Sequence, residues 1–169
     1  IMADTSLIVQ KYTGQFSDKT KLVHVTHAIN WSGQILPVKA IAEAAKKQNL
    51  EVLVDGAHTF GQIDFNIPDL NCDYFGTSLH KWLCAPFGTG MLYVKKDKIS
   101  KIYPLMAAPD SKSEDIRKFE HIGTRSIAIE QGIGQAIDFH QMIGSQRKEA
   151  RLRYLKNYWT EKVLKFKGV

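Results

Sequence analysis

The sequence predicts an α/β domain in which a parallel or mixed β-sheet is covered by helices. Four short runs of apolar, β-branched and aromatic residues have the length of strands, and a segment of helical periodicity separates the first two. Strand, helix and strand in this order are typical of a sheet with helices packed on its faces. At 169 residues the chain is long enough for one domain that buries a hydrophobic core without disulfides or a metal.

The expected strands are bounded by loop-forming or polar residues, and they cover residues 21–27, 52–54, 74–77 and 90–94. Pro37 suits the first turn of the helix between the first two strands, and apolar residues recur at helical spacing until Asn49. The charged residues 95–101 predict a surface turn after the last strand.

Two further helices are expected in the last third of the chain. A polar loop from Pro109 to Asp115 precedes a helix whose apolar residues include Ile129 and Ile133 and which should stop at Gly144. The last helix carries a narrow apolar stripe with basic residues on its other face. The stripe is made by Leu152, Leu155, Trp159, Val163 and Phe166.

The charge of the chain is concentrated near its end. The formal net charge is +6, and the segment from Arg147 to Val169 supplies all of it with eight Lys/Arg against two Asp/Glu. A solvated basic helix explains this distribution better than a nucleic-acid site, which needs basic residues gathered on a folded face with aromatic stacking partners. We therefore expect no nucleic-acid partner.

Two cysteines in a chain of this length indicate buried thiols in a reducing compartment, because Cys72 and Cys84 lie too far apart for a C-x-x-C motif. The expected location is cytoplasmic. No apolar run approaches the roughly 18 residues that span a bilayer, so no membrane partner is expected. The chain begins at Ile1 rather than an initiator methionine, and an upstream segment is therefore expected.

Polar side chains gather where the predicted strands end. Asp55 closes the second strand, and Ser78, His80 and Lys81 follow the third. In open α/β sheets, ligands bind at the carboxyl ends of the strands. A lysine in such a partly buried place is suited to act as a nucleophile.

These groups meet the needs of pyridoxal phosphate, which takes a lysine for a Schiff base, an acid against its pyridinium nitrogen, a donor near its ring hydroxyl, and polar groups around its phosphate. The candidates are Lys81 for the lysine, Asp55 for the acid, Asn30 and His58 for the ring, and Ser78 and His80 for the phosphate.

Three segments in this order, residues 25–33 (VTHAINWSG), 54–58 (VDGAH) and 78–82 (SLHKW), resemble the class V aminotransferase family. The family includes cysteine desulfurases and isopenicillin N epimerase-like enzymes. Residues 81–90 (KWLCAPFGTG) and 119–125 (FEHIGTR) look more like the epimerase-like branch. The resemblance implies the large domain of a fold type I pyridoxal-phosphate-dependent transferase, with a mixed sheet flanked by helices.

The resemblance also implies roles for single residues. It places Asp55 at the pyridinium nitrogen, Asn30 at the ring hydroxyl, Ser78 and His80 at the phosphate, and Lys81 as the aldimine lysine. His58 takes the place where desulfurases carry a glutamine. In this family the threonine that matches Thr124 reaches the phosphate bound in the neighbouring subunit, which implies a homodimer with shared active sites.

The resemblance covers about residues 22 to 128. The family's upstream phosphate loop has no counterpart before Lys21, and its small domain with the substrate-carboxylate arginine is also absent. We therefore expect residues 1–144 to form part of the large cofactor-binding domain, and residues 145–169 to form a basic amphipathic helix that leads toward a small domain.

The implied activity is chemistry at the α-carbon of an amino acid, either epimerase-like or aminotransferase. The alternatives are a cysteine desulfurase or selenocysteine lyase type of enzyme and, from another class, a catalytically silent binding protein with this fold.

A metal site built from histidines and Asp55 is disfavoured, because His24, His27, His58 and His80 lack the tight spacing of zinc ligands. His24 and His27 are instead expected at strand edges.

Overall fold

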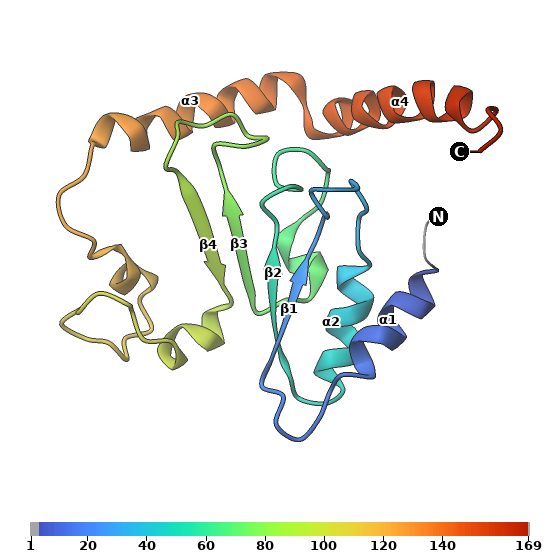
Figure 1. Cartoon of the computed structure of the whole chain (residues 1–169). Helices are drawn as coiled ribbons and strands as arrows, with labels where there is room; N and C mark the ends of the chain where they lie inside the picture. The colour runs from blue at the N-terminus through green and yellow to red at the C-terminus, as the bar shows by residue number, and fades with distance from the viewer. Residues whose placement is uncertain (1–3, 169) are drawn as a thin grey trace.

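A computed structural model describes residues 4–168 (Figure 1). Four strands form one sheet in the order β1-β2-β3-β4. They are β1 (Leu22–Thr26), β2 (Glu51–Asp55), β3 (Tyr74–Ser78) and β4 (Gly90–Val94). The first three run parallel, and β4 runs antiparallel to β3. The α/β class, the mixed sheet and the four expected strands are confirmed.

The helices are α1 (Thr5–Thr13), α2 (Val38–Lys46), α3 (Ile127–Ile143) and α4 (Ser145–Val163). Short 3-10 helices are η1 (Ile67–Leu70), η2 (Lys96–Lys101) and η3 (Ile116–Glu120). The structure confirms α2, α3 and α4, and Gly144 lies at the end of α3 as expected. Sequence reasoning missed α1. The surface turn predicted for residues 95–101 is wrong, because η2 forms there and buries Ile99.

The hydrophobic core lies between one face of the sheet and α2. Every second residue of β1 and β2 is buried there, and the core comprises Val23, Val25, Val52, Val54 and Phe75 with Val38, Ile41, Ala42 and Ala45 of α2. Burying one such valine or isoleucine contributes roughly 1.5–3 kcal/mol to folding. Figure 1 shows α1 beside α2, and Ile8, Val9 and Tyr12 of α1 pack on this core.

The opposite face of the sheet is only partly covered. Tyr74, Val94 and Ile99 form a small buried cluster at one end of it. Farther along the sheet, Leu22 and Leu92 remain 46% and 51% exposed. Leu53, in the strand expected to be apolar throughout, is therefore only half-buried.

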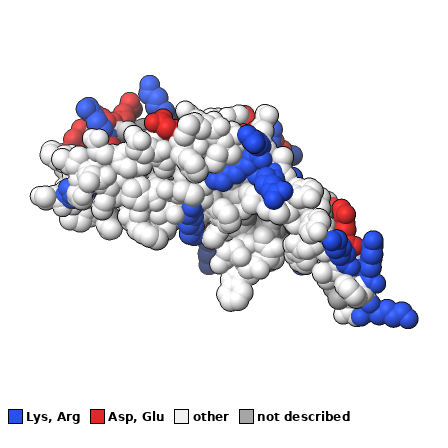
Figure 2. All heavy atoms as spheres, turned by 90° about the horizontal axis from the view of Figure 1, so that it is seen from above, with Lys and Arg blue, Asp and Glu red and all other residues white. Residues whose placement is uncertain are grey.

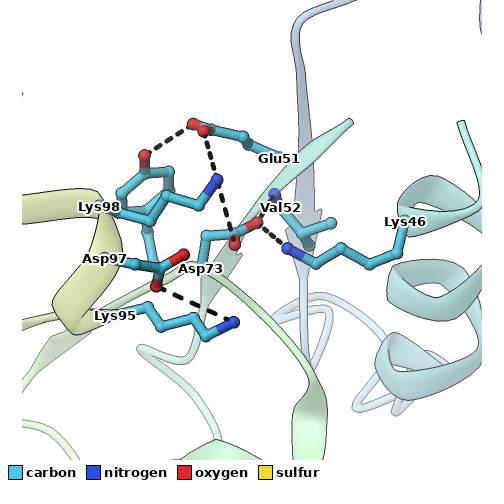
Figure 3. Close-up of polar contacts among 8 residues, drawn as sticks. Lys46, Glu51, Val52, Asp73, Lys95, Asp97 and Lys98 are labelled. Carbon is cyan, nitrogen blue, oxygen red and sulfur yellow. Dashed lines mark hydrogen bonds and ion pairs between the residues drawn. The ribbon is translucent and has the colours of Figure 1, made fainter. Parts of the chain in front are cut away.

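A buried carboxylate joins several elements at the end of the sheet where β3 begins (Figure 3). Asp73 is fully buried, and its Oδ2 accepts hydrogen bonds from the backbone N–H of Val52, at 2.8 Å, and from the Lys46 ammonium of α2. Lys98 of η2 lies 3.9 Å from Asp73 Oδ1 and donates to Glu51 Oε1 at 2.7 Å. Its bond to Glu51 raises the pKa of Lys98.

The long helices α3 and α4 run nearly end to end across that end of the sheet where β3 terminates (Figure 1). No residue of α4 is buried, and the predicted stripe is largely exposed, with Leu155 at 44% and Trp159 at 55%. Figure 2 shows Lys and Arg side chains on the protruding end of the molecule that α4 forms. Among the helices within residues 4–168, none is both long and apolar enough to cross a lipid bilayer.

Gly56, directly after β2, lies against the ring of the buried Phe75. A Cβ atom at Gly56 would come within 1.9 Å of Phe75 Cζ. The absence of a side chain therefore lets the chain turn over the ring immediately after Asp55.

His27 follows β1 and is buried, so the expectation that it lies at a strand edge is wrong, whereas His24 in the edge strand β1 is exposed. The Nδ1 atom of His27 lies 3.0 Å from Thr59 Oγ1, and its ring packs edge-on against Phe65. Burial lowers the pKa of His27 to about 4, because the imidazolium would lose its hydration.

This burial predicts a loss of stability in mild acid. Between a pKa of about 6.5 in the unfolded chain and about 4 in the folded chain, the unfolded state binds more protons. The free energy of unfolding should therefore fall by roughly 2 kcal/mol between pH 7 and pH 5. Urea denaturation at both pH values measures this. His27→Gln should remove most of the difference, and His24→Gln should keep it; an unchanged difference in His27→Gln would contradict the prediction.

Candidate active site at the carboxyl ends of the strands

A cavity of about 710 Å³ opens beside the carboxyl ends of β2 and β3. Asp55, Ser78 and Lys81 line it together. Asp55 is the last residue of β2, Ser78 is the last residue of β3, and Lys81 lies in the loop that follows. The parallel pairing of β2 with β3 places both strand ends at the same edge of the sheet.

The carboxylate of Asp55 is held by the turn that follows β2. Its Oδ1 accepts a hydrogen bond from the backbone N–H of Ala57 at 2.9 Å. Gly56 donates its N–H to the carbonyl of Gly76 in β3, and Thr77 Oγ1 donates to the carbonyl of Gly56. These bonds fix the turn to β3, so that the half-buried carboxylate has a defined position in the cavity wall.

The turn after β2 also places His58 next to the amine of Lys81. His58 Nε2 lies 3.0 Å from Lys81 Nζ, and Trp82 Nε1 donates to His58 Nδ1 at 3.4 Å. Among residues 4–168 no carboxylate lies within ion-pair distance of Lys81. The amine of Lys81 therefore contacts an imidazole and borders the cavity that Asp55 and Ser78 line.

Gly61 allows the turn and the lysine loop to come this close. It has a φ of +74°, and a Cβ atom there would lie 2.9 Å from Leu83 N. At the other side of the loop, the ammonium of Lys148 in α4 donates to the carbonyl of Trp82. The lysine loop is therefore held between the His58 turn and the first turns of α4.

Four of the predicted residues do not line this cavity, and of these only His58 contacts a residue that does. Asn30 lies exposed in a turn after β1, and Thr124 lies exposed in the segment before α3. His80 has its Nδ1 atom 3.3 Å from the carbonyl of Thr89 and its ring 5.9 Å from that of Phe87. The structure thus brings together Asp55, Ser78, Lys81 and His58 and leaves the other three apart from them.

Sequence reasoning assigned no role to Trp82 or Gly61, although both shape the surroundings of Lys81. The contact from Trp82 to His58 spans 24 positions in the chain, so no local sequence pattern indicates it. Gly61 gave a weak indication of its role, since an isolated glycine near a turn often marks a close backbone approach.

The residues present fit pyridoxal phosphate. An amine, a carboxylate and a hydroxyl lie around one cavity, and the Cα of Gly76 leaves open space within 4 Å of where a side chain would begin. Lys81 would hold the cofactor covalently, and Asp55 is an acid of the type that pairs with a pyridinium nitrogen.

Among residues 4–168, no three His, Cys, Asp or Glu side chains gather as they would around a metal ion.

The close approach at Gly61 predicts a difference between two glycine variants. Gly61→Ala should lower the free energy of unfolding by about 3 kcal/mol, because it adds both a positive-φ penalty and a backbone clash. Gly88→Ala should lower the free energy of unfolding by only about 1 kcal/mol, because it adds the positive-φ penalty without a clash. The φ of Gly88 is +85°, and nothing lies within 4 Å of the new Cβ. Equal losses in urea denaturation would show that the contact with Leu83 does not constrain the loop.

The chain is similar to known proteins over nearly its whole length. The statistical model of the aminotransferase class-V family matches residues 1–169. An isopenicillin N epimerase from Amycolatopsis lactamdurans is 28% identical over 96% of this chain and 44% of its own length. A probable cysteine desulfurase from Halalkalibacterium halodurans is 33% identical over 100% of this chain and 44% of its own length. The chain thus spans less than half the length of these relatives.

Solved structures show the same fold. The apo structure of a cysteine desulfurase from Thermococcus onnurineus superposes with a TM-score of 0.79 at 27% identity, over 94% of this chain and 40% of that one. A cysteine desulfurase from Escherichia coli superposes with a TM-score of 0.82 over 95% of this chain and 42% of that one, and at 19% identity it supports the fold alone. The chain therefore has the fold of fold type I pyridoxal-phosphate-dependent enzymes.

Proposed function

Because the chain belongs to the aminotransferase class-V family, we propose that it supplies part of the active site of a pyridoxal-phosphate-dependent enzyme acting at the α-carbon of an amino acid. The observation that carries this proposal is the cavity that Asp55, Ser78 and Lys81 share. Residues 1–144 would belong to its large cofactor-binding domain, and α4 would lead toward a small domain.

In this proposal each residue has a task set by its position. Lys81 Nζ would hold the cofactor, and its amine would move the proton at the α-carbon of the substrate. Asp55 keeps a proton on the ring nitrogen, and Ser78 offers its hydroxyl to the phosphate. The bound cofactor supplies an electron sink for the bond that breaks at the α-carbon.

The remaining predicted residues would bind parts of the cofactor, although they do not line the cavity described above. Asn30 would bind the ring hydroxyl, and His80 would bind the phosphate. Thr124 is exposed and does not line the cavity of its own chain, which suits a residue that serves the phosphate of a neighbouring subunit. We therefore propose a homodimer with shared active sites.

An epimerase-like or aminotransferase reaction is favoured over a desulfurase, because His58 lies at Lys81 where the resemblance implies a glutamine in desulfurases. A cysteine desulfurase remains the second candidate, since a relative of that name is 33% identical over the whole chain. A catalytically silent relative is disfavoured, because a protein without this chemistry has no need for an amine and a carboxylate in one cavity.

Covalent labelling tests the role of Lys81. We expect borohydride treatment of the full-length protein with pyridoxal phosphate to leave a pyridoxyl group on Lys81, located by peptide mass spectrometry. Lys81→Arg should lose the label, because a guanidinium does not condense with the aldehyde. Lys96→Arg, which changes an exposed lysine of η2, should keep it. A folded protein without label on Lys81 would instead favour a silent binding protein.

The reaction class is tested with the loaded full-length protein in D₂O that contains dithiothreitol, because a desulfurase leaves its sulfur as a persulfide and releases sulfide only when a reductant supplies two electrons. We expect deuterium to enter the α-position of an amino-acid substrate without release of sulfide from cysteine, because Lys81 moves the α-proton in epimerisation and transamination. NMR of the amino acid and a sulfide assay measure the two outcomes. Stoichiometric or repeated sulfide release from cysteine would establish the desulfurase alternative.

A further inference from the structure

Helix α4 is joined to the rest of the domain at its first turns. Within residues 4–168, the hydrogen bonds between α4 and other elements involve only residues 145–149 of the helix, and farther along Tyr158 and Trp159 are more than half exposed. We propose that Lys148 and Glu149 are positioning residues through which α4 holds the loop that carries Lys81. This inference rests on the proposed function, in which Lys81 is the reactive residue.

Lys148 contacts the lysine loop at the peptide group next to the reactive residue. Its ammonium donates to the carbonyl of Trp82, which directly follows Lys81. The loop is closed on itself by the N–H of Cys84, which donates to the carbonyl of Lys81 at 3.2 Å. The contact at Trp82 therefore lies within the same turn as Lys81 and restrains both residues.

Glu149 contacts the other loop of the site, which runs from the end of β2 through His58 to Asp64. Its Oε2 accepts the backbone N–H of Asp64 at 2.8 Å, and its Oε1 accepts from Arg153 at 2.6 Å. Burial alone raises the pKa of Glu149, but the hydrogen bonds from Asp64 and Arg153 outweigh burial and lower it. The carboxylate is therefore charged at neutral pH, and a charged acceptor binds a backbone N–H more strongly than a neutral one does.

The two loops also contact each other. His58 Nε2 lies 3.0 Å from Lys81 Nζ, and a Cβ atom at Gly61 would lie 2.9 Å from Leu83 N. Each loop thus contacts the other, and both contact adjacent residues of α4. Because the three parts form a closed set of contacts, loss of either contact with α4 should loosen both loops.

The junction before α4 keeps the two contact residues in place. Only Gly144, with a φ of +86°, separates α3 from α4, and across it His140 Nε2 lies 3.0 Å from Ser145 Oγ. Figure 1 shows this junction beside the loop that follows β2. An α-helix rises about 1.5 Å per residue, so Lys148 and Glu149 lie within about 8 Å of Gly144 along the helix axis. Over so short a distance the direction of the far end of α4 has little effect on them.

The position of the Lys81 amine matters for capture of pyridoxal phosphate. The amine has to meet the aldehyde carbon of the cofactor, and a misplacement of about 1 Å can slow a reaction between two held groups roughly a hundredfold. A loop fixed by α4 and by the loop after β2 would keep the amine at the wall of the cavity that Asp55 and Ser78 also line.

Hydrogen exchange of the full-length protein without cofactor tests the coupling, read by mass spectrometry on peptides that cover residues 60–66 and 79–85. Lys148→Met should speed exchange in residues 79–85 about tenfold, because the charged donor to Trp82 is lost. It should also speed exchange in residues 60–66 about threefold, and Glu149→Ala should likewise affect both segments. Lys148→Arg and Glu149→Gln keep a donor and an acceptor, so both should behave like the wild type. Effects confined to the loop that each variant touches would overturn the proposal.

Two controls separate positioning from general stability. Lys156→Met and Glu161→Ala change exposed residues farther along α4 and should leave exchange in both segments unchanged. The urea midpoint of Lys148→Met should stay close to that of the wild type, because the hydrophobic core is untouched. A lower midpoint with faster exchange throughout the chain would show that Lys148 only stabilises the fold, and would also overturn the proposal.

The rate at which Lys81 captures pyridoxal phosphate, trapped with borohydride, is the functional readout. At saturating cofactor, Lys148→Met should slow capture about tenfold, because the amine is held less closely where it meets the aldehyde, and Lys148→Arg should restore the rate. An unchanged rate in Lys148→Met would show that α4 does not position Lys81. If the wild type captures no cofactor, the proposed function fails, whereas the exchange data still decide whether α4 couples the two loops.

Discussion

The buried carboxylate of Asp73 is the interaction on which the site at the far end of the sheet depends. It accepts hydrogen bonds from the backbone N–H of Val52 and from the ammonium of Lys46, and so connects the beginning of β3 to β2 and to α2. Removing one partner of such a buried pair costs about 3–5 kcal/mol. Because side chains alternate along a strand, a slip of β3 by one residue would turn Ser78 to the other face of the sheet. The register set at Asp73 therefore positions Ser78 and the lysine loop relative to Asp55.

The two ends of the sheet thus have different physical characters. Around Asp73, one buried carboxylate is paired with Lys46 and lies 3.9 Å from Lys98, which joins β2, β3, α2 and η2. At the carboxyl ends, the amine of Lys81 and the carboxylate of Asp55 border an open cavity and have few partners of their own. Polar groups left accessible in this way remain free to bind a ligand.

The sequence predicted the strands and the residues at their ends well, because both follow from local patterns. Alternating or continuous apolar runs mark β1 to β4, and Asp55, Ser78 and Lys81 simply end or follow them. Contacts between distant segments were not predictable. The approach of His58 to Lys81 and Trp82 depends on how the turn at Gly61 packs on the lysine loop, and no periodicity encodes that packing.

Weak or misleading patterns account for the errors. Helix α1 carries no buried residue, so its sequence lacks a strong apolar face, and η2 buries only Ile99 among charged neighbours. His27 looked like a strand-edge residue because it is polar and close to β1, whereas Thr59 and Phe65 enclose it. The roles of Asn30, His80 and Thr124 depend on a bound cofactor or a second subunit, and they remain predictions.

The contact between Gly56 and Phe75 links two positions that are distant in the sequence and adjacent in the fold. Since a Cβ at residue 56 would overlap the aromatic ring, a larger residue there is compatible only with a smaller one at position 75. Homologous chains should therefore vary at these positions in a correlated way, and an aromatic residue at 75 should accompany glycine at 56. The position of the Asp55 carboxylate would be inherited with that pair of residues.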